Sequence, residues 1–183
     1  MKSKILKEYD DNLEDWKKVP PISGYEPSVN WDEIKIAKGD VFFRQLLISL
    51  PCLKIIKGHA EFGFWNGDAL SLEIITGNAW FQNWKGTAPK LESIGGNADF
   101  YGWKGKAPKL ESIGGDAYFE NWKGSAPKLE TIGGRAFFKN WQSSAPNLKS
   151  IEGIAYFRDW EGVAPNLKSI KNQNFKAYKN YEI

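Results

Sequence analysis

The fold is decided by residues 94–131, which read IGGNADFYGWKGKAPKLES and then, one unit later, IGGDAYFENWKGSAPKLET. The pattern extends in both directions, because glycine recurs every nineteen residues at Gly39, Gly58, Gly77, Gly96, Gly115, Gly134 and Gly153. Seven units therefore fill residues 39–171 without an insertion. A fixed short period is typical of a solenoid, in which each unit stacks on the one before it.

Large apolar residues occupy fixed columns of this repeat. The complete phenylalanine column is Phe43, Phe62, Phe81, Phe100, Phe119, Phe138 and Phe157, and complete Leu and Ile columns run beside it. Trp is present in six of the seven units, from Trp65 to Trp160. We expect each column to form a ladder along the solenoid axis, so the aromatic residues of these columns belong to the core.

The segments between the columns indicate β structure. The run I-x-G-x-A-x-F alternates with a period of two and predicts one strand with a buried face, in which Gly and Ala leave room for the aromatic rings. The run W-x-G-x-A-P is too rich in Gly and Pro for a helix and predicts an arc. The sequence therefore predicts an all-β solenoid, leucine-rich-repeat-like or β-helix-like, of seven 19-residue coils.

Both ends of a solenoid need protection against edge pairing. Residues 1–38 are expected to form an N-terminal capping segment with a short helix over residues 3–18, where Ile5, Tyr9, Leu13 and Trp16 fall near helical spacing. Trp31, Ile34 and Ile36 suggest a degenerate coil before the solenoid of residues 39–171. Residues 172–183 are expected to form a C-terminal cap, and open ends would allow copies of the chain to associate end to end.

The composition argues against several classes of function. The chain has 183 residues, a net charge of +3, one cysteine (Cys52) and one histidine (His59). These counts exclude an internal disulfide framework, a cysteine-based zinc cluster and a multi-histidine metal site. We therefore expect a protein that is not an enzyme and has no metal or other cofactor.

The chain also lacks the sequence signals of a membrane or secreted protein. No apolar run approaches the ~20 residues that cross a bilayer. The first residues, MKSKILKE, have neither the apolar core nor the cleavage site of an ordinary secretion signal. We expect a cytoplasmic protein without a membrane partner.

One run of the repeat points to a family. The pattern L-x-x-I-x-G-x-A-x-F, as in Leu110-Glu-Ser-Ile113-Gly-Gly115-Asp-Ala117-Tyr-Phe119, resembles bacterial leucine-rich-repeat-like proteins and is similar to the coil of receptor L domains. The unit lacks the Asn that closes the leucine-rich consensus and adds a Trp column, so a leucine-rich horseshoe and a tighter β-helix both remain open. The resemblance implies ligand binding, usually of a protein, without catalysis or a cofactor.

The positions between the inward columns vary from coil to coil. The middle outward row is Phe42, Glu61, Trp80, Asp99, Tyr118, Phe137 and Tyr156. One neighbouring row is Asp40, His59, Asn78, Asn97, Asp116, Arg135 and Ile154, and the other is Arg44, Gly63, Gln82, Tyr101, Glu120, Lys139 and Arg158. Constant inner columns beside a variable aromatic face are typical of a binding scaffold, although such aromatics also pair across strands as simple sheet filler. Because Trp, Tyr and Arg dominate protein interfaces, we expect a protein partner to be bound by Trp80, Tyr101, Tyr118, Phe137, Tyr156, Arg135 and Arg158.

Three other functions were weighed against protein binding. Exposed aromatics could serve a carbohydrate-binding module, although the irregular row argues against a repetitive polymer. The basic end, with Arg135 and Arg158, could contact nucleic acid, but a net charge of +4 over residues 134–183 is small for that purpose. Glu61 and Asp99 lie two coils apart on one outward row, a separation of about 10 Å that is slightly long for the carboxylate pair of an inverting glycosidase, and the sequence places nothing else around them.

Overall fold

The computed structural model describes residues 33–43 and 51–171, and the described chain is built from two parallel sheets. The odd-numbered strands form one sheet: β1 (Ile36–Ala37), β3 (Ile55–Ile56), β5 (Ile74–Ile75), β7 (Ser93–Ile94), β9 (Ser112–Ile113), β11 (Thr131–Ile132), β13 (Ser150–Ile151) and β15 (Ser169–Ile170). The even-numbered strands form the other: β2 (Val41–Phe42), β4 (Ala60–Glu61), β6 (Ala79–Trp80), β8 (Ala98–Asp99), β10 (Ala117–Tyr118), β12 (Ala136–Phe137) and β14 (Ala155–Tyr156).

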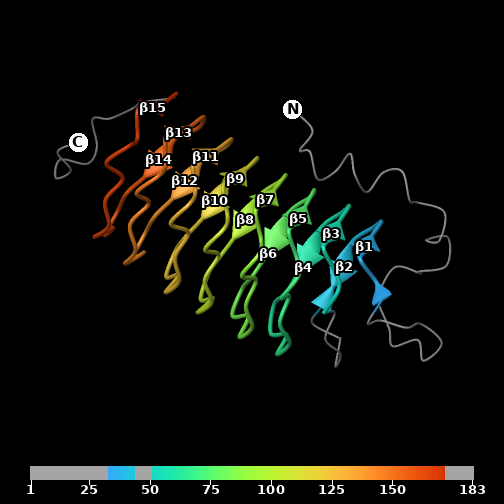
Figure 1. The fold of residues 1–183 in the computed structure, drawn as a ribbon. Helices are drawn as coiled ribbons and strands as arrows, with labels where there is room; N and C mark the ends of the chain where they lie inside the picture. The colour runs from blue at the N-terminus through green and yellow to red at the C-terminus, as the bar shows by residue number, and fades with distance from the viewer. Residues whose placement is uncertain (1–32, 44–50, 172–183) are drawn as a thin grey trace.

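Successive coils stack in a single row, from β1 and β2 at the blue end to β15 at the red end (Figure 1). Each strand pairs with the equivalent strand of the next coil, so Ala117 lies between Ala98 and Ala136. The register repeats every nineteen residues along both sheets. The protein is thus an all-β parallel solenoid of about seven coils, which confirms the fold predicted from the repeat.

The stretch from Ile to Phe differs from the single strand that alternation predicts. Ser112–Ile113 and Ala117–Tyr118 belong to different sheets, and the chain bends between them at Gly114 and Gly115. The coils remain in contact through this bend, where the Gly115 N–H donates to the carbonyl oxygen of Gly96 at 2.9 Å. A Cβ at Gly114 would lie 2.2 Å from the Gly95 oxygen, so glycine is needed here for coil-to-coil approach. The alternation suggested that glycine leaves room for the Phe and Trp rings. At Gly114 and Gly115 the reason for glycine is instead the close approach of neighbouring coils.

The Phe, Trp, Leu, Ile and Ala columns form the core as predicted. In the central coils the Phe and Trp side chains are fully buried and stack on their equivalents, as in Phe100–Phe119 at 5.3 Å and Trp103–Trp122 at 5.6 Å between ring centroids. Phe100 also stacks on Trp122 of the next coil at 4.6 Å. The interior is therefore one continuous aromatic stack that shares its rings between neighbouring coils.

Each buried indole from Trp84 onward also makes a polar contact along the axis. The Trp122 Nε1–H donates to the Gly105 carbonyl oxygen at 3.0 Å, and Trp103 does the same to Gly86 at 2.9 Å. Satisfying the indole N–H is the condition on which a Trp can be buried without penalty. The residue two positions after each Trp therefore supplies the carbonyl oxygen that accepts the indole N–H of the next coil's Trp.

A tight turn joins the Phe and Trp columns. The Trp103 N–H donates to the Phe100 carbonyl oxygen at 3.1 Å, and the residue before the Trp has a positive φ angle. Left-handed backbone favours Gly and Asn, and this position holds Asn83, Gly102, Asn121, Asn140 and Asp159. Phe64 is the exception, with a φ of 61° and 62 % of the residue exposed.

The outer face of the odd-numbered sheet changes character along the solenoid. Ile36, Ile55 and Ile74 are in register on the first three odd-numbered strands, and we call these three residues the isoleucine stripe. The same position holds Ser93, Ser112, Thr131, Ser150 and Ser169 in the following coils. The apolar part of this outer face is therefore confined to the N-terminal coils.

The capping segments lie largely outside the described residues. The helix expected at residues 3–18, Trp31 and the C-terminal cap at residues 172–183 are all in that part of the chain. Of the degenerate coil, Ile34 and Ile36 are buried and Ile36 belongs to β1, so the odd-numbered sheet already includes residues within the 1–38 segment. Within residues 33–43 and 51–171, no helix combines the length and apolarity needed to cross a membrane.

Candidate interaction surface

The middle outward row lies on the even-numbered sheet as the sequence predicted. Trp80, Tyr118, Phe137 and Tyr156 are each the second residue of their strand and point away from the core, half-buried. Asp99 separates Trp80 from the other three in the register. The structure therefore brings together Tyr118, Phe137 and Tyr156 on three consecutive strands, and we call these residues the outer ladder.

The rings of the outer ladder are stacked face to face. The Tyr118 and Phe137 centroids are 4.8 Å apart with planes 3° from parallel, and those of Phe137 and Tyr156 are 4.6 Å apart at 6°. Both faces of Phe137 are thus covered by its neighbours. What the ladder offers to a partner at Phe137 is the edge of the ring, which carries the positive end of the ring quadrupole.

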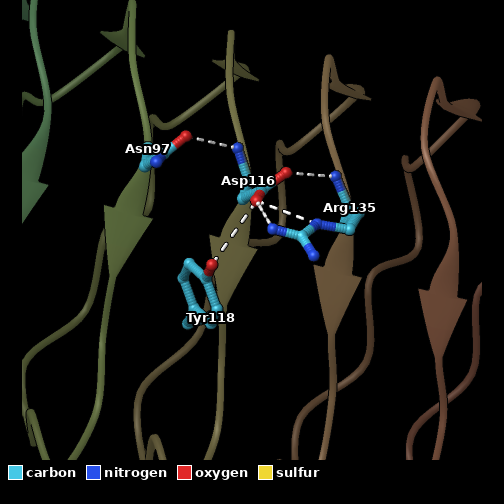
Figure 2. Close-up of polar contacts among 4 residues, drawn as sticks. All are labelled: Asn97, Asp116, Tyr118 and Arg135. Atoms are coloured by element: carbon cyan, nitrogen blue, oxygen red, sulfur yellow. Dashed lines mark hydrogen bonds and ion pairs between the residues drawn. The ribbon is translucent and has the colours of Figure 1, made fainter.

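Arg135 is fixed beside this ladder by Asp116 of the preceding coil. Its Nε and Nη2 atoms donate to Asp116 Oδ2 at 3.0 and 2.7 Å, while its backbone N–H donates to Asp116 Oδ1 at 2.7 Å (Figure 2). The guanidinium carbon is also 5.7 Å from the centroid of the Phe137 ring, within the range of a cation–π contact. The third guanidinium nitrogen, drawn without a dashed line in Figure 2, points away from Asp116.

Asp116, Tyr118 and Arg135 shift one another's pKa values. The hydrogen bond from Arg135 is the main cause that lowers the pKa of Asp116, against a smaller opposing effect of burial. Burial and the nearby Asp116 carboxylate raise the pKa of Tyr118, whose hydroxyl donates to Asp116 Oδ2 at 3.4 Å. Asp116 is therefore ionised and Tyr118 is a neutral phenol throughout the neutral pH range.

The row that includes Arg135 is less free to vary than the sequence suggested. In five successive coils the side chain accepts the backbone N–H of the equivalent residue one coil later, at 2.7–2.8 Å. We call these five residues the acceptor column: Asp40, His59, Asn78, Asn97 and Asp116. Variation among Asp, His and Asn here is variation among short acceptors that stabilise the bend, so most of this row has a structural role.

The acceptor column ends at Asp116, because the next residue of the row is Arg135. A guanidinium has no acceptor atom, so Arg135 cannot continue the pattern to Ile154 of the next coil. The coil in which the side-chain acceptor is missing is the coil that carries Phe137, the central residue of the outer ladder. A position that gives up a coil-to-coil hydrogen bond is a candidate for a different role.

The other expected anchors lie at the margins of the outer ladder. Tyr101 is 47 % exposed and follows Asp99, whose Oδ1 accepts the Tyr101 backbone N–H at 2.9 Å. Trp80 is separate from the ladder and its ring centroid is 5.8 Å from that of His59. Arg158 is exposed and pairs with its own neighbour Asp159, with Nε 3.3 Å from Oδ2. The structure thus gathers four of the seven expected residues, namely Tyr118, Phe137, Tyr156 and Arg135.

The two candidate carboxylates, Glu61 and Asp99, are not neighbours in the register of the even-numbered sheet. Asp99 uses both carboxylate oxygens locally, since Oδ1 accepts from Tyr101 and Oδ2 accepts from the side-chain amide of Gln82. Trp80 lies between Glu61 and Asp99 in the register. Among the described residues, no group of three or more His, Cys, Asp and Glu side chains is placed to hold a metal ion.

Comparisons with known proteins give no information about this surface. No family model, curated protein or solved structure matches the chain. The fold and the clustered residues are therefore the basis for any statement about function.

Proposed function

We propose that this solenoid is a non-enzymatic binding protein whose partner is another protein, bound on the outer face of the even-numbered strands. The centre of the interface is the outer ladder together with Arg135. The observation that carries the proposal is the placement of three stacked rings beside a guanidinium that is hydrogen-bonded to Asp116, at the coil where the acceptor column stops.

Rigidity is what makes these residues suitable anchors. Aromatic rings and Arg carry most of the binding energy in protein interfaces, and a side chain that is already immobile loses little entropy on binding. The rings of the outer ladder are held by each other, and Arg135 is held by two bonds to Asp116 and by Phe137. Trp80, Tyr101 and Arg158 would extend the contact at its margins.

The same geometry favours a protein over a glycan or a nucleic acid. Sugars and bases bind aromatic residues by stacking on an open ring face. Phe137 has neither face open, because Tyr118 and Tyr156 cover both. A protein surface, by contrast, can pack against ring edges and place a carbonyl or carboxylate next to them. The sequence resemblance of the coils to leucine-rich-repeat-like proteins supports the same choice, and we propose a distant relationship to them.

The test uses the full chain and a purified partner. The tagged protein is used to isolate binding proteins from its native cells, each candidate is purified, and its Kd is measured by calorimetry. We expect Tyr118→Ala combined with Tyr156→Ala to weaken binding by at least about 30-fold, since one interface hot spot contributes 2 kcal/mol or more.

Phe64→Asn provides the matched control. It removes an exposed aromatic ring from another part of the solenoid and introduces the residue that other coils use at that position. We expect this variant to bind as the wild type does. Equal Kd values for the wild type and the ladder variant, for every partner isolated, would overturn the proposed surface.

A further inference from the structure

The isoleucine stripe is buried although it lies on the outside of the solenoid. Ile36, Ile55 and Ile74 are 4 %, 0 % and 4 % exposed, yet they are not members of the interior core cluster. The equivalent Ser93 and Ser112 are more accessible, and Thr131 is exposed. Whatever covers this face is therefore restricted to the first three coils.

We propose that the N-terminal segment of the same chain, residues 3–18, docks across the isoleucine stripe on the outer face of β1, β3 and β5. This inference is independent of the proposed function, which concerns the other sheet. It also differs from an end cap, because the segment would lie along the side of the solenoid.

The sequence of the segment fits such a docking site. Ile5, Tyr9, Leu13 and Trp16 are separated by steps of four, four and three, so in a helix they would share one apolar side. A helix of sixteen residues is about 24 Å long. That length is more than enough to cross three strands, whose spacing of ~4.8 Å places the outer two about 10 Å apart.

The connection is also long enough. The stripe begins at Ile36, and residues 19–32 join the proposed helix to Glu33, which lies three residues before Ile36. Fourteen extended residues reach roughly 45 Å, so the segment can return to any of the three strands. Closeness along the chain explains why the apolar face is limited to the first coils.

Charge complementarity supports the same occupant. Four lysines lie within two residues of Ile36 or Ile55, namely Lys35, Lys38, Lys54 and Lys57. Residues 8–15 of the segment read EYDDNLED and carry five carboxylates. Over residues 3–18 these five carboxylates stand against four lysines at the two ends, a net charge of −1, so the acidic part of the segment is its middle. This acidic stretch would meet the lysines beside Ile36 and Ile55, whereas Ile74 is flanked by Glu73, which lies 3.7 Å from Lys54.

The test is hydrogen–deuterium exchange of the full chain, followed in peptides that cover residues 3–18. We expect these amides to exchange at least about tenfold more slowly than in a synthetic peptide of residues 1–20, because a docked helix opens only with its contacts. The variant Ile36→Ser, Ile55→Ser, Ile74→Ser gives the stripe the residue of the later coils and should abolish that protection. Exposed Ile154 supplies the matched control, and Ile154→Ser should leave it intact.

A second variant provides an independent test in case the triple serine variant destabilises the coils that carry the stripe. Leu13→Ser with Trp16→Ser changes only the segment, and it should release residues 3–18 while residues 90–160 keep their wild-type exchange. Unprotected residues 3–18 in the wild type, or protection that survives both variants, would overturn the proposal. So would a wild-type dimer in light scattering that becomes a monomer in the serine variant, because a second copy would then be the cover.

Discussion

Replacing either of two adjacent phenylalanines, Phe137 and Phe138, with alanine should have different effects. The change at Phe138 should mainly lower stability, and the change at Phe137 should mainly weaken partner binding. Phe138 is fully buried and stacks on four rings: Phe119 at 5.3 Å, Phe157 at 5.1 Å, Trp141 at 5.8 Å and Trp160 at 4.7 Å. Phe137 is half-buried on the outer face and stacks on two rings. The pair separates the role of the inner core from that of the outer ladder within one coil.

The magnitudes follow from these surroundings. Phe138→Ala opens a cavity in a core that is shared by neighbouring coils, and such a change lowers the free energy of unfolding by about 3–5 kcal/mol. Phe137→Ala removes two cross-strand pairs worth roughly 0.2–1 kcal/mol each and opens no cavity, so about 1 kcal/mol is expected. Binding should follow the reverse order, because Phe137→Ala removes the centre of the proposed interface.

The assay is guanidinium denaturation followed by tryptophan fluorescence and circular dichroism, with both probes fitted to a coupled-coil model since repeat arrays need not unfold in two states. Phe138→Leu, which retains most of the buried volume, serves as a milder companion. Equal destabilisation by Phe137→Ala and Phe138→Ala, or a loss of less than about 1 kcal/mol of unfolding free energy in Phe138→Ala, would show that Phe138 is not part of a core shared between coils.

Three further predictions concern the turns and the bend. Phe64→Asn should raise the free energy of unfolding by about 1 kcal/mol, because Asn tolerates the left-handed backbone better than Phe does, and the guanidinium midpoint measures it. Asn97→Ala should lower it by about 1 kcal/mol, because the backbone N–H of the next coil loses its acceptor, whereas Asn97→Asp should retain the wild-type melting temperature within experimental error. Asp116→Asn should cost at most about 1 kcal/mol at pH 7. Since Arg135 lowers the pKa of Asp116 in the folded state, its stabilisation is complete above the unfolded pKa of about 3.9 and is lost as the pH falls through the lower folded value. The difference between the melting temperatures of wild type and variant should therefore begin to shrink below about pH 4 and disappear below the folded pKa, and a constant difference down to pH 2 would contradict that assignment.

The periodicity of the sequence was sufficient to predict the solenoid and its core. A residue that recurs at one position in every coil has an identical neighbour above and below it, so columns such as Phe100–Phe119 translate directly into ladders. The division into two sheets was not predictable in this way. Alternation continues unbroken from Ile113 to Phe119, and only the close approach at Gly114 shows that the chain bends there.

The candidate site was predicted in part. Outward aromatics at Tyr118, Phe137 and Tyr156 follow from the register of the repeat, and their position beside Arg135 is visible in the sequence. The shared role of the acceptor column was not predicted, because Asp, His and Asn differ in charge although each offers a short acceptor. Its signal was present in the sequence, since apart from Arg135 and Ile154 every member of that row can accept a hydrogen bond.

The isoleucine stripe shows a different limit. Ile55 and Ile56 are adjacent and both are buried, although they point to opposite faces of one strand. The repeat identifies Ile56 as a core residue because Ile recurs there in all seven coils. The repeat gives no such indication for Ile55, because the equivalent residue is Ser or Thr in every odd-numbered strand after β5. Only the burial of Ile55 in the structure reveals a second covered surface.

The proposed partner contacts the solenoid at the outer ladder. The direct measurement is photo-crosslinking in extracts of the native cells, with p-benzoylphenylalanine in place of Phe137 or in place of Thr131, which is exposed on the odd-numbered sheet of the same solenoid. We expect a covalent adduct with one defined protein from position 137, abolished by Tyr118→Ala with Tyr156→Ala, and no adduct with that protein from position 131. The same adduct from position 131 in equal or greater yield would contradict this expectation.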